Sequence, residues 1–160
     1  MQVLVFEDDG VERLWPLTTF RPACDITIGA QTLCEILSHI GSVFRVLRPS
    51  LAMHLDAIAD SRVVFWGASV TPSAIEPLMS THGALVVLVN ARVVPSRATM
   101  IALRSLVEAG RRGIVWDGDT MTAAILHRTS DGDGPDDMAM QQLIDTRSTD
   151  SIRALRLDTL

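Results

Sequence analysis

The chain opens with an unbroken apolar run that ends in three carboxylates and a glycine. Residues 2–6 are Gln-Val-Leu-Val-Phe, and residues 7–10 are Glu-Asp-Asp-Gly. A valine-rich run without polar alternation is typical of a parallel strand that is buried on both faces. In an open α/β sheet, the carboxyl ends of such strands carry the ligand-binding loops. We therefore expect residues 7–29 to form a binding loop at this edge of a sheet.

Apolar runs and helical patterns alternate along the rest of the chain. Further strands are predicted at 43–47, 62–66, 84–89, 114–116 and 122–126, the last two forming a hairpin across Asp117-Gly118-Asp119. Helices are predicted after the capping box Thr32-Leu-Cys-Glu35, after Pro49, and from the cap Ser96 to residue 109. Residues 68–83 are expected to be a loop because Pro72 and Pro77 prevent a long helix. This order predicts a layered α/β domain with helices on both faces and residues 84–89 as a central strand.

Size and charge exclude several classes of protein. At 160 residues the chain has the length of about one domain. Its net charge of −5, without a local basic patch, argues against a nucleic-acid or anionic-membrane partner. Its apolar runs are far shorter than the ~20 residues that cross a bilayer, and its start lacks the basic residues of a signal peptide. We therefore expect a soluble, cytoplasmic protein.

Arginine is the only strongly basic residue type. All 14 basic residues are arginine, and the chain contains neither lysine nor tyrosine. A guanidinium group grips phosphate in a planar, two-point way but stays protonated, so it cannot serve as a general base. Any phosphate clamp in this protein must therefore be built from arginine.

The two cysteines are expected to be structural. Cys24 and Cys34 have neither the short spacing of a metal-binding pair nor the number needed for a disulfide framework. Reduced thiols packed in the interior are the favoured interpretation, ahead of a redox role.

The opening residues resemble a known family, the sugar nucleotidyltransferases related to N-acetylglucosamine-1-phosphate uridylyltransferase, and in particular their N-terminal domain. The resemblance rests on Phe6-Glu-Asp-Asp9, Leu14-Trp-Pro-Leu-Thr18, Arg21-Pro22, Asp25 and Gly29, with Asn90-Ala-Arg92 later in the chain. It implies a Rossmann-like, three-layer nucleotidyltransferase-type domain with a mostly parallel sheet, truncated relative to classical members. It covers roughly residues 1–128.

The resemblance also implies an activity. Family members transfer a nucleotidyl group from a nucleoside triphosphate to a sugar 1-phosphate with Mg²⁺, by in-line attack that needs no protein nucleophile. Nucleotide and sugar phosphate are therefore the expected ligands. The glycine-rich loop and the catalytic lysine of classical members are absent from this chain. The alternative is an inactive nucleotide-sugar-binding or regulatory module attached to an acyltransferase domain.

Site residues follow from matching positions. The resemblance implies catalytic roles for Arg21 and Asn90, nucleotide or sugar-phosphate binding by Glu7, Arg13, Thr18, Arg21, Asp25 and Arg92, and Mg²⁺ binding by Asp8 and Asp9. Ordinary structural roles remain open for them: the carboxylates as a solvated turn, the two loop arginines as surface charges or ion-pair partners of those carboxylates, and the asparagine as turn chemistry. Trp15 is expected to anchor the loop on the core, with stacking over a base or sugar ring as the alternative.

Electrostatics poses a difficulty for this assignment. The three carboxylates of residues 7–9 take the position of a phosphate cradle. Two like unit charges about 4 Å apart repel by on the order of 4 kcal/mol at an effective dielectric near 20. The loop should therefore repel a bare triphosphate, unless Mg²⁺ bridges carboxylates and phosphates.

The end of the chain changes character. Residues 130–137 are acidic and glycine-rich, which favours a flexible linker, and they lack the closing glutamate of a calcium-binding EF-hand loop. Short helices are expected at 138–144 and 152–157. We therefore divide the chain into a nucleotidyltransferase-like domain at 1–129 and a linker with a helical tail at 130–160. Members of the family commonly continue into a left-handed β-helix domain, and the resemblance implies that homo-oligomers would form through such a domain.

Overall fold

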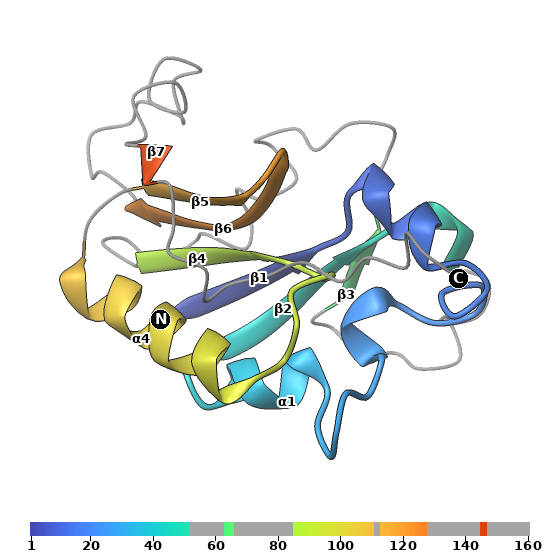
Figure 1. Cartoon of the computed structure of the whole chain (residues 1–160), viewed down its shortest axis with the longest axis horizontal. Helices are drawn as coiled ribbons and strands as arrows, with labels where there is room; N and C mark the ends of the chain where they lie inside the picture. Colours follow the sequence, from blue (N-terminus) through green and yellow to red (C-terminus); the bar gives the residue numbers. More distant parts are fainter. Residues whose placement is uncertain (52–62, 66–84, 111–112, 128–144, 147–160) are drawn as a thin grey trace.

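A computed structural model describes residues 1–51, 63–65, 85–110, 113–127 and 145–146. Figure 1 shows the elements that these residues form. The strands are β1 (Gln2–Phe6), β2 (Ser42–Leu47), β3 (Val63–Phe65), β4 (Leu85–Asn90), β5 (Gly113–Asp117), β6 (Thr120–His127) and β7 (Asp145–Thr146). The helices are η1 (Asp9–Leu14), η2 (Ala23–Asp25), α1 (Leu33–Ser38), η3 (Pro49–Leu51) and α4 (Arg97–Ala109), where η marks a 3₁₀ helix.

The described strands form one mixed sheet in the order β3-β2-β1-β4-β6-β5-β7. Strands β1 to β4 pair in parallel, β6 runs antiparallel to both β4 and β5, and β7 is parallel to β5. The predicted α/β fold with a mostly parallel sheet is therefore confirmed. So is the central position of the 84–89 run, because β4 is the middle strand.

Alternate residues of the strands supply two apolar clusters, one on each face of the sheet. On one face Val3 and Val5 pack in a cluster with Leu33 and Leu37 of α1 and Leu103 of α4. Figure 1 shows both of these helices on that face. The other face carries a smaller cluster made by Leu4, Val46, Val86, Leu88 and Ala124. Burial on both faces explains why the strand sequences show no polar alternation.

Local sequence signals set the ends of the helices and the hairpin. Thr32 and Glu35 form the predicted capping box at the start of α1. Ser96 caps α4 by accepting a hydrogen bond from the Thr99 N–H, and Gly110 ends that helix in the left-handed region with φ +59°. The predicted hairpin is formed by β5 and β6, with Gly118 also at φ +59° in its turn.

Two regions differ from the sequence-based expectation or lie beyond the described residues. The loop of residues 7–29 contains two 3₁₀ helices that no periodicity indicated. Strand β7 adds two residues of the predicted tail to the sheet, beside β5. Several predicted segments fall outside the described residues: most of the helix after Pro49, the loop at 68–83, and the linker and short helices of 130–144 and 152–157. The second helical layer and the domain boundary at 129 therefore stay predictions.

Within the described part of the chain, none of the helices has the length and apolar character needed to cross a bilayer.

Candidate functional site

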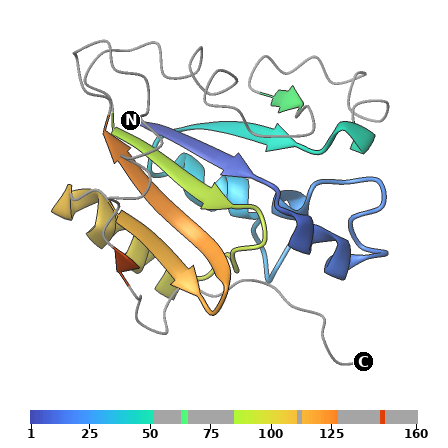
Figure 2. The ribbon, with the colours of Figure 1, turned by 90° about the horizontal axis from the view of Figure 1, so that it is seen from above.

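Three parallel strands end side by side where the long loop begins. Phe6 at the end of β1 pairs with Val46 of β2 and with Asn90 of β4. The backbone extends this alignment by one residue, because the Ala91 N–H donates to the Phe6 carbonyl at 2.7 Å. Figure 2 shows β1, β2 and β4 running toward the loop and its 3₁₀ helices. The register thus gathers the residues that follow each strand at one edge of the sheet.

Asp8 and Arg92 form a two-point ion pair at this edge. Arg92 donates from Nε to Oδ1 of Asp8 at 2.7 Å and from Nη2 to Oδ2 at 2.6 Å. Asn90 adds a third hydrogen bond, from Nδ2 to Oδ2 of Asp8 at 2.8 Å. Bidentate, charge-assisted pairs of this kind are among the strongest hydrogen bonds in proteins. The structure therefore brings together three residues that the sequence assigned to the site.

The surroundings of this pair fix it in place. The side chain of Arg92 is only 5% exposed, and its backbone N–H donates to Oδ1 of Asn90 at 2.9 Å. Asn90 is fully buried and also donates to the carbonyl of Met121 on β6 at 3.0 Å. Gly10 lies flat against the guanidinium, since a Cβ there would come within 2.5 Å of Cζ of Arg92. The ion pair is thus held by three strands and by a glycine of the loop.

The ion pair changes the acidity of Asp8. Partial burial alone would raise the pKa of this carboxyl. Hydrogen bonds from Arg92 and Asn90, together with the charge of Arg92, outweigh burial and hold the pKa of Asp8 below its usual value of 3.8. Asp8 is therefore an ionised, neutralised carboxylate at neutral pH.

Glu7 makes a second ion pair, with Arg48. Nη1 of Arg48 donates to Oε1 of Glu7 at 2.7 Å, and the Arg48 backbone N–H donates to Oε2 at 3.2 Å. The Ala23 N–H at the start of η2 donates to Oε1 at 2.9 Å. The Glu7 side chain is only 2% exposed. Glu7 therefore holds the loop in place through its contacts with Arg48 and Ala23, and we call this set of contacts the brace. A contact between Glu7 and a ligand stays a prediction.

Arg48 extends this brace across the loop. Its Nη2 donates to the carbonyl oxygens of Thr18 and, at 3.3 Å, of Arg21. Arg48 is not among the site residues predicted from the sequence. Its position directly after a parallel strand was the available signal, because that is where residues of such a site gather.

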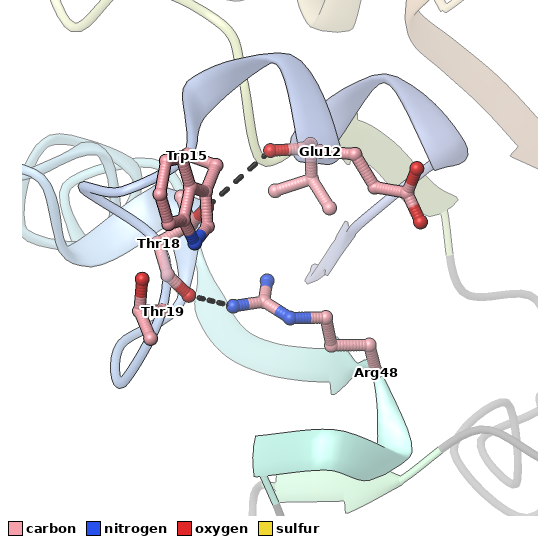
Figure 3. A pocket seen from close by; sticks show the side chains of 6 residues that line it. Glu12, Trp15, Thr18, Thr19 and Arg48 are labelled. Carbon is pink, nitrogen blue, oxygen red and sulfur yellow. Dashed lines mark hydrogen bonds between the residues drawn. The ribbon is translucent and has the colours of Figure 1, made fainter.

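An open pocket of about 410 Å³ lies between η1, the following loop and the end of β2. Figure 3 shows Glu12, Trp15, Thr18, Thr19 and Arg48 around it, and Val11 also lines it. The pocket is thus lined by an indole ring, two threonine residues, a guanidinium group and the acidic residue Glu12. Of the predicted site residues, only Thr18 lines it.

The anchor of the loop is not the residue expected. Trp15 is 72% exposed, so the prediction that it packs on the core is wrong. Its neighbour Leu14 is 1% exposed and belongs to the main core cluster. Because Leu14 secures the loop, the indole ring of Trp15 is left at the surface of the pocket.

The remaining predicted site residues lie at the surface of the loop or, for Asp25, in a separate ion pair. Asp9, Arg13 and Arg21 are exposed, and Arg21 donates from Nε to the Leu17 carbonyl at 3.0 Å. Asp25 faces Arg45 of β2, whose Nη1 lies 3.3 Å from Oδ2. Burial, the largest influence, raises the pKa of Asp25 against the opposing charge of Arg45.

The cysteines lie beside Asp25. Cys24 is fully buried and Cys34 partly buried, and both are free thiols. A hydrogen bond with Cys34, followed by burial, raises the pKa of Cys24 well above its usual range. The prediction that the thiols pack in the interior is therefore confirmed for Cys24 and in part for Cys34, and their reduced state stays a prediction.

The ion pairs of Glu7 and Asp8 remove much of the repulsion that the three carboxylates were expected to exert on a phosphate. Of the three carboxylates after β1, Glu7 is paired with Arg48 and Asp8 with Arg92. Only Asp9 is an exposed carboxylate. The edge of the sheet therefore carries far less negative charge than its sequence suggests, and Arg13 and Arg21 add exposed positive charge.

Comparisons with known proteins bear on this site. The profile of the family described as sugar nucleotidyl transferase matches residues 3–156. No curated protein sequence matches the chain. Several solved structures resemble it as well. One is a mannose-1-phosphate geranyltransferase from Thermus thermophilus, with 23% identity, a TM-score of 0.49, and coverage of 71% of this chain and 39% of that one.

Another is described as a glucose-1-phosphate thymidylyltransferase from Bacillus anthracis in complex with a sucrose, with 10% identity, a TM-score of 0.46, and coverage of 71% of this chain and 53% of that one. The chain thus matches about two fifths to one half of each of these longer proteins. The family match spans the loop, its ion pairs and all of the described sheet except Gln2. The chain therefore belongs to the sugar nucleotidyl transferase family.

Proposed function

We propose that this chain is a sugar-1-phosphate nucleotidyltransferase-type domain that binds a nucleotide or a sugar phosphate in the pocket beside Arg48. The observation that carries the proposal is the pocket itself, which lies between η1, the helix that follows β1, and Arg48, the residue that follows β2. Its volume of about 410 Å³ is within the range of small-molecule sites. The family of the chain supports the same ligand class.

The lining of the pocket suits a nucleoside or sugar. The exposed indole of Trp15 offers a flat face for stacking on a base or a sugar ring. Thr19 is exposed, and its hydroxyl donates to the Pro16 carbonyl at 2.8 Å, which leaves oxygen lone pairs available to a ligand hydroxyl. The loop that carries both residues is held by the Glu7–Arg48 pair, so the pocket is formed before the ligand arrives.

Phosphate groups would be neutralised by arginine. Arg13 and Arg21 are exposed guanidinium groups on the loop that lines the pocket, whereas the charge of Arg48 is already balanced by Glu7. Nucleotidyl transfer by in-line attack needs positioning and charge stabilisation more than covalent chemistry by the protein. The loop arginines would hold the phosphates, and the buried Asp8–Arg92 pair would keep the adjoining strand ends in place.

Mg²⁺ belongs to this proposal as an expectation of the family. Its fit to Asp8 is poor, because three hydrogen bonds fill three of about four lone-pair positions on that carboxylate and a guanidinium group lies against it. Asp9, exposed at the start of η1, is the carboxylate that could meet a Mg²⁺ ion carried by the substrate phosphates.

A second candidate function is favoured by the same ion pair. Asp8 and Arg92, assigned by resemblance to metal and phosphate, satisfy each other and are largely withdrawn from solvent. A domain that has lost turnover but kept nucleotide-sugar binding would show this arrangement. It would act as a binding or regulatory module.

One pair of assays separates the two functions. The purified chain is incubated with a panel of nucleoside triphosphates and sugar 1-phosphates with Mg²⁺, pyrophosphate release is followed, and binding of the same compounds is measured by calorimetry. The proposed transferase releases pyrophosphate with one triphosphate and sugar phosphate pair. Binding without pyrophosphate release would establish the second function, and absence of binding would exclude both.

Substitutions of exposed arginines test whether the ligand binds at the loop, whichever of the two functions the assays establish. Arg21→Ala should weaken triphosphate binding about tenfold, which corresponds to the loss of about 1.4 kcal/mol. Arg104→Ala, which removes an exposed arginine of α4, is the matched control and should leave binding unchanged. Equal effects of the two substitutions would show that only overall charge matters and that the loop does not bind the ligand.

A further inference from the structure

Three metal-ligating side chains converge where the loop meets the first helix. Cys24, Asp25 and Cys34 each offer one ligand atom, and these atoms lie within 4.8 Å of one another. Sγ of Cys24 is 3.8 Å from Oδ1 of Asp25. In a tetrahedral zinc site, metal–sulfur bonds of about 2.3 Å and metal–oxygen bonds of about 2.0–2.2 Å place the ligand atoms about 3.5–3.8 Å apart. The three atoms are therefore at most about 1.3 Å from the spacing that an ion requires.

The elements that carry these side chains are fixed. Cys24 is fully buried in the main core cluster, and η2 packs against α1. The helix that carries Cys34 is held at its start by the capping box, in which the Thr32 N–H donates to Oε2 of Glu35 at 2.7 Å and the Glu35 N–H donates to Oγ1 of Thr32 at 3.2 Å. Because these side chains lie on helices that are already held in place, binding of an ion does not require the chain to become ordered first.

The charges balance once an ion is present. Two thiolates and one carboxylate carry three negative charges, and a divalent cation brings two positive charges. Arg45 supplies the third, since its Nη1 lies 3.3 Å from Oδ2 of Asp25. A partner of this kind also orients the ligating carboxylate, as outer-shell groups do in metal sites.

We propose that Cys24, Asp25 and Cys34 bind one thiophilic divalent cation, for which Zn²⁺ is the best match. Thiolate ligands select Zn²⁺ over the oxygen-seeking Mg²⁺, so this site is chemically distinct from the one expected at Asp8 and Asp9. Both thiols release their protons to solvent when the ion binds. The Asp25 side chain is 34% exposed, so water can complete the fourth position of a tetrahedron.

The site does not depend on the proposed function. Its two cysteines lie ten positions apart in the chain, a spacing that does not suggest a metal pair. Only the packing of η2 on α1 brings them together. A bound ion would cross-link the end of the loop to the helix, and the expected effect is a higher melting temperature with no requirement for nucleotide.

Cobalt is the most direct probe of this proposal. The full chain, reduced and freed of metal, is titrated with Co²⁺ and then with Zn²⁺. We expect one equivalent of Co²⁺ to produce thiolate-to-cobalt charge-transfer absorption and the visible bands of tetrahedral cobalt, and Zn²⁺ to abolish both. Because the chain has two cysteines, charge-transfer absorption from two thiolates identifies both as ligands. Absence of this absorption would overturn the proposal.

Variants measured by zinc competition against a chromophoric chelator test each ligand. Loss of an outer-shell partner typically weakens metal binding about 10–100-fold. Cys34→Ser and Asp25→Asn each remove a direct ligand and should therefore weaken Zn²⁺ binding by more than this. The control is Asp119→Asn, which removes an exposed carboxylate of the β5–β6 turn and should leave Zn²⁺ binding unchanged. If Asp25→Asn binds Zn²⁺ as tightly as Asp119→Asn and the unmodified chain do, the assignment of Asp25 as a ligand is contradicted.

A thiol count made alongside excludes the redox alternative. The proposal predicts two titratable thiols in the reduced chain and strong protection of both by one equivalent of Zn²⁺. Formation of a Cys24–Cys34 disulfide under mild glutathione-based oxidation, with no protection by Zn²⁺, would instead show a redox pair and overturn the metal site.

Discussion

At the scale of single residues, neighbours decide what each of the three consecutive carboxylates does. Glu7 is buried and braces the loop, Asp8 binds Arg92 in two-point geometry, and Asp9 is exposed. The sequence presents these residues as one acidic cluster. In the structure they have separate roles, because Arg48 after β2 pairs with Glu7 and Arg92 after β4 pairs with Asp8. None of the described contacts pairs Asp9 with an arginine.

Removal of the Asp8 carboxylate tests this division. Asp8→Asn leaves the 5% exposed guanidinium of Arg92 without its counter-charge. We expect the free energy of unfolding to fall by about 2–4 kcal/mol, somewhat below the usual cost of breaking a fully buried pair because Asp8 itself is 30% exposed. Asp9→Asn should change it by less than about 0.5 kcal/mol. Urea unfolding of both variants provides the comparison, and equal costs would contradict the assignment.

The pH dependence of the same pair has a defined sign. The pKa of Asp8 is lower in the folded protein than the 3.8 of an unperturbed carboxyl, so the unfolded chain binds more protons between these two values. The stability from Asp8 is therefore complete well above pH 3.8 and is lost as the pH falls through the folded-state pKa. The stability difference between the natural chain and Asp8→Asn should shrink in that acid range. A difference that stays constant until acid unfolding would disprove the linkage.

Gly10 supplies a test of close packing against the same guanidinium. A Cβ at this position would overlap Arg92, which Asp8 prevents from moving aside. We expect Gly10→Ala to cost about 1–3 kcal/mol, in the range of overpacked sites. In an Asp8→Asn background the cost should fall, because Arg92 is then free to shift. A double-mutant cycle measures this coupling, and strict additivity would show that the overlap is relieved in another way.

At the scale of elements, the long loop is secured by side chains more than by regular structure. Its two 3₁₀ helices are short, and their position is set by Leu14 in the core and by the contacts of Glu7 and Arg48. Removal of the brace should therefore affect the loop more than the sheet.

Amide hydrogen exchange detects such a local effect. Glu7→Gln removes the charge that holds Arg48 and weakens the acceptor of the Ala23 N–H. We expect faster exchange at Ala23 and Arg48, with β1 and β4 protected as before once exchange is corrected for global stability. Asp9→Asn is the matched control, since it removes the exposed carboxylate of the same run. Equal acceleration across loop and sheet would mean that Glu7 supports the whole fold and not the loop.

The same contrast explains what sequence reasoning could and could not find. Strands such as β1 and β4 and the cap of α1 follow from local patterns, because apolar runs and capping boxes act through near neighbours. The partners of Glu7 and Asp8 lie 41 and 84 residues further along the chain, and only the register of the sheet joins them. Arg48, Gly10 and the pairing of Cys24 with Cys34 were therefore not recognised as parts of a site.

Trp15 shows a different limit of such reasoning. A tryptophan in an apolar context is usually packed in the interior, and the sequence contains no local signal that Leu14 would take that place. The exposure of Trp15 depends on which face η1 turns toward the core. That choice is made by tertiary packing, which periodicity over six residues does not reveal.

At the scale of the whole molecule, the sheet presents one edge with a prepared pocket in a chain of net charge −5. Internal ion pairs neutralise the acidic start of the loop, and exposed arginines border it. The family match across residues 3–156 includes every part of this arrangement. The central claim is that this pocket is the ligand-binding site of the domain.

Two exposed aromatic residues of one loop allow the most direct measurement of that claim. Trp15 lines the pocket and is 72% exposed, whereas Phe20 is 69% exposed and is not among the residues that line it. Calorimetric binding of the best triphosphate or sugar phosphate is compared for the natural chain, Trp15→Ala and Phe20→Ala. We predict a loss of about 1–3 kcal/mol of binding free energy for Trp15→Ala, as for a stacked aromatic, and no loss for Phe20→Ala. Unchanged affinity in Trp15→Ala, or equal losses in both variants, would contradict the assignment of the pocket.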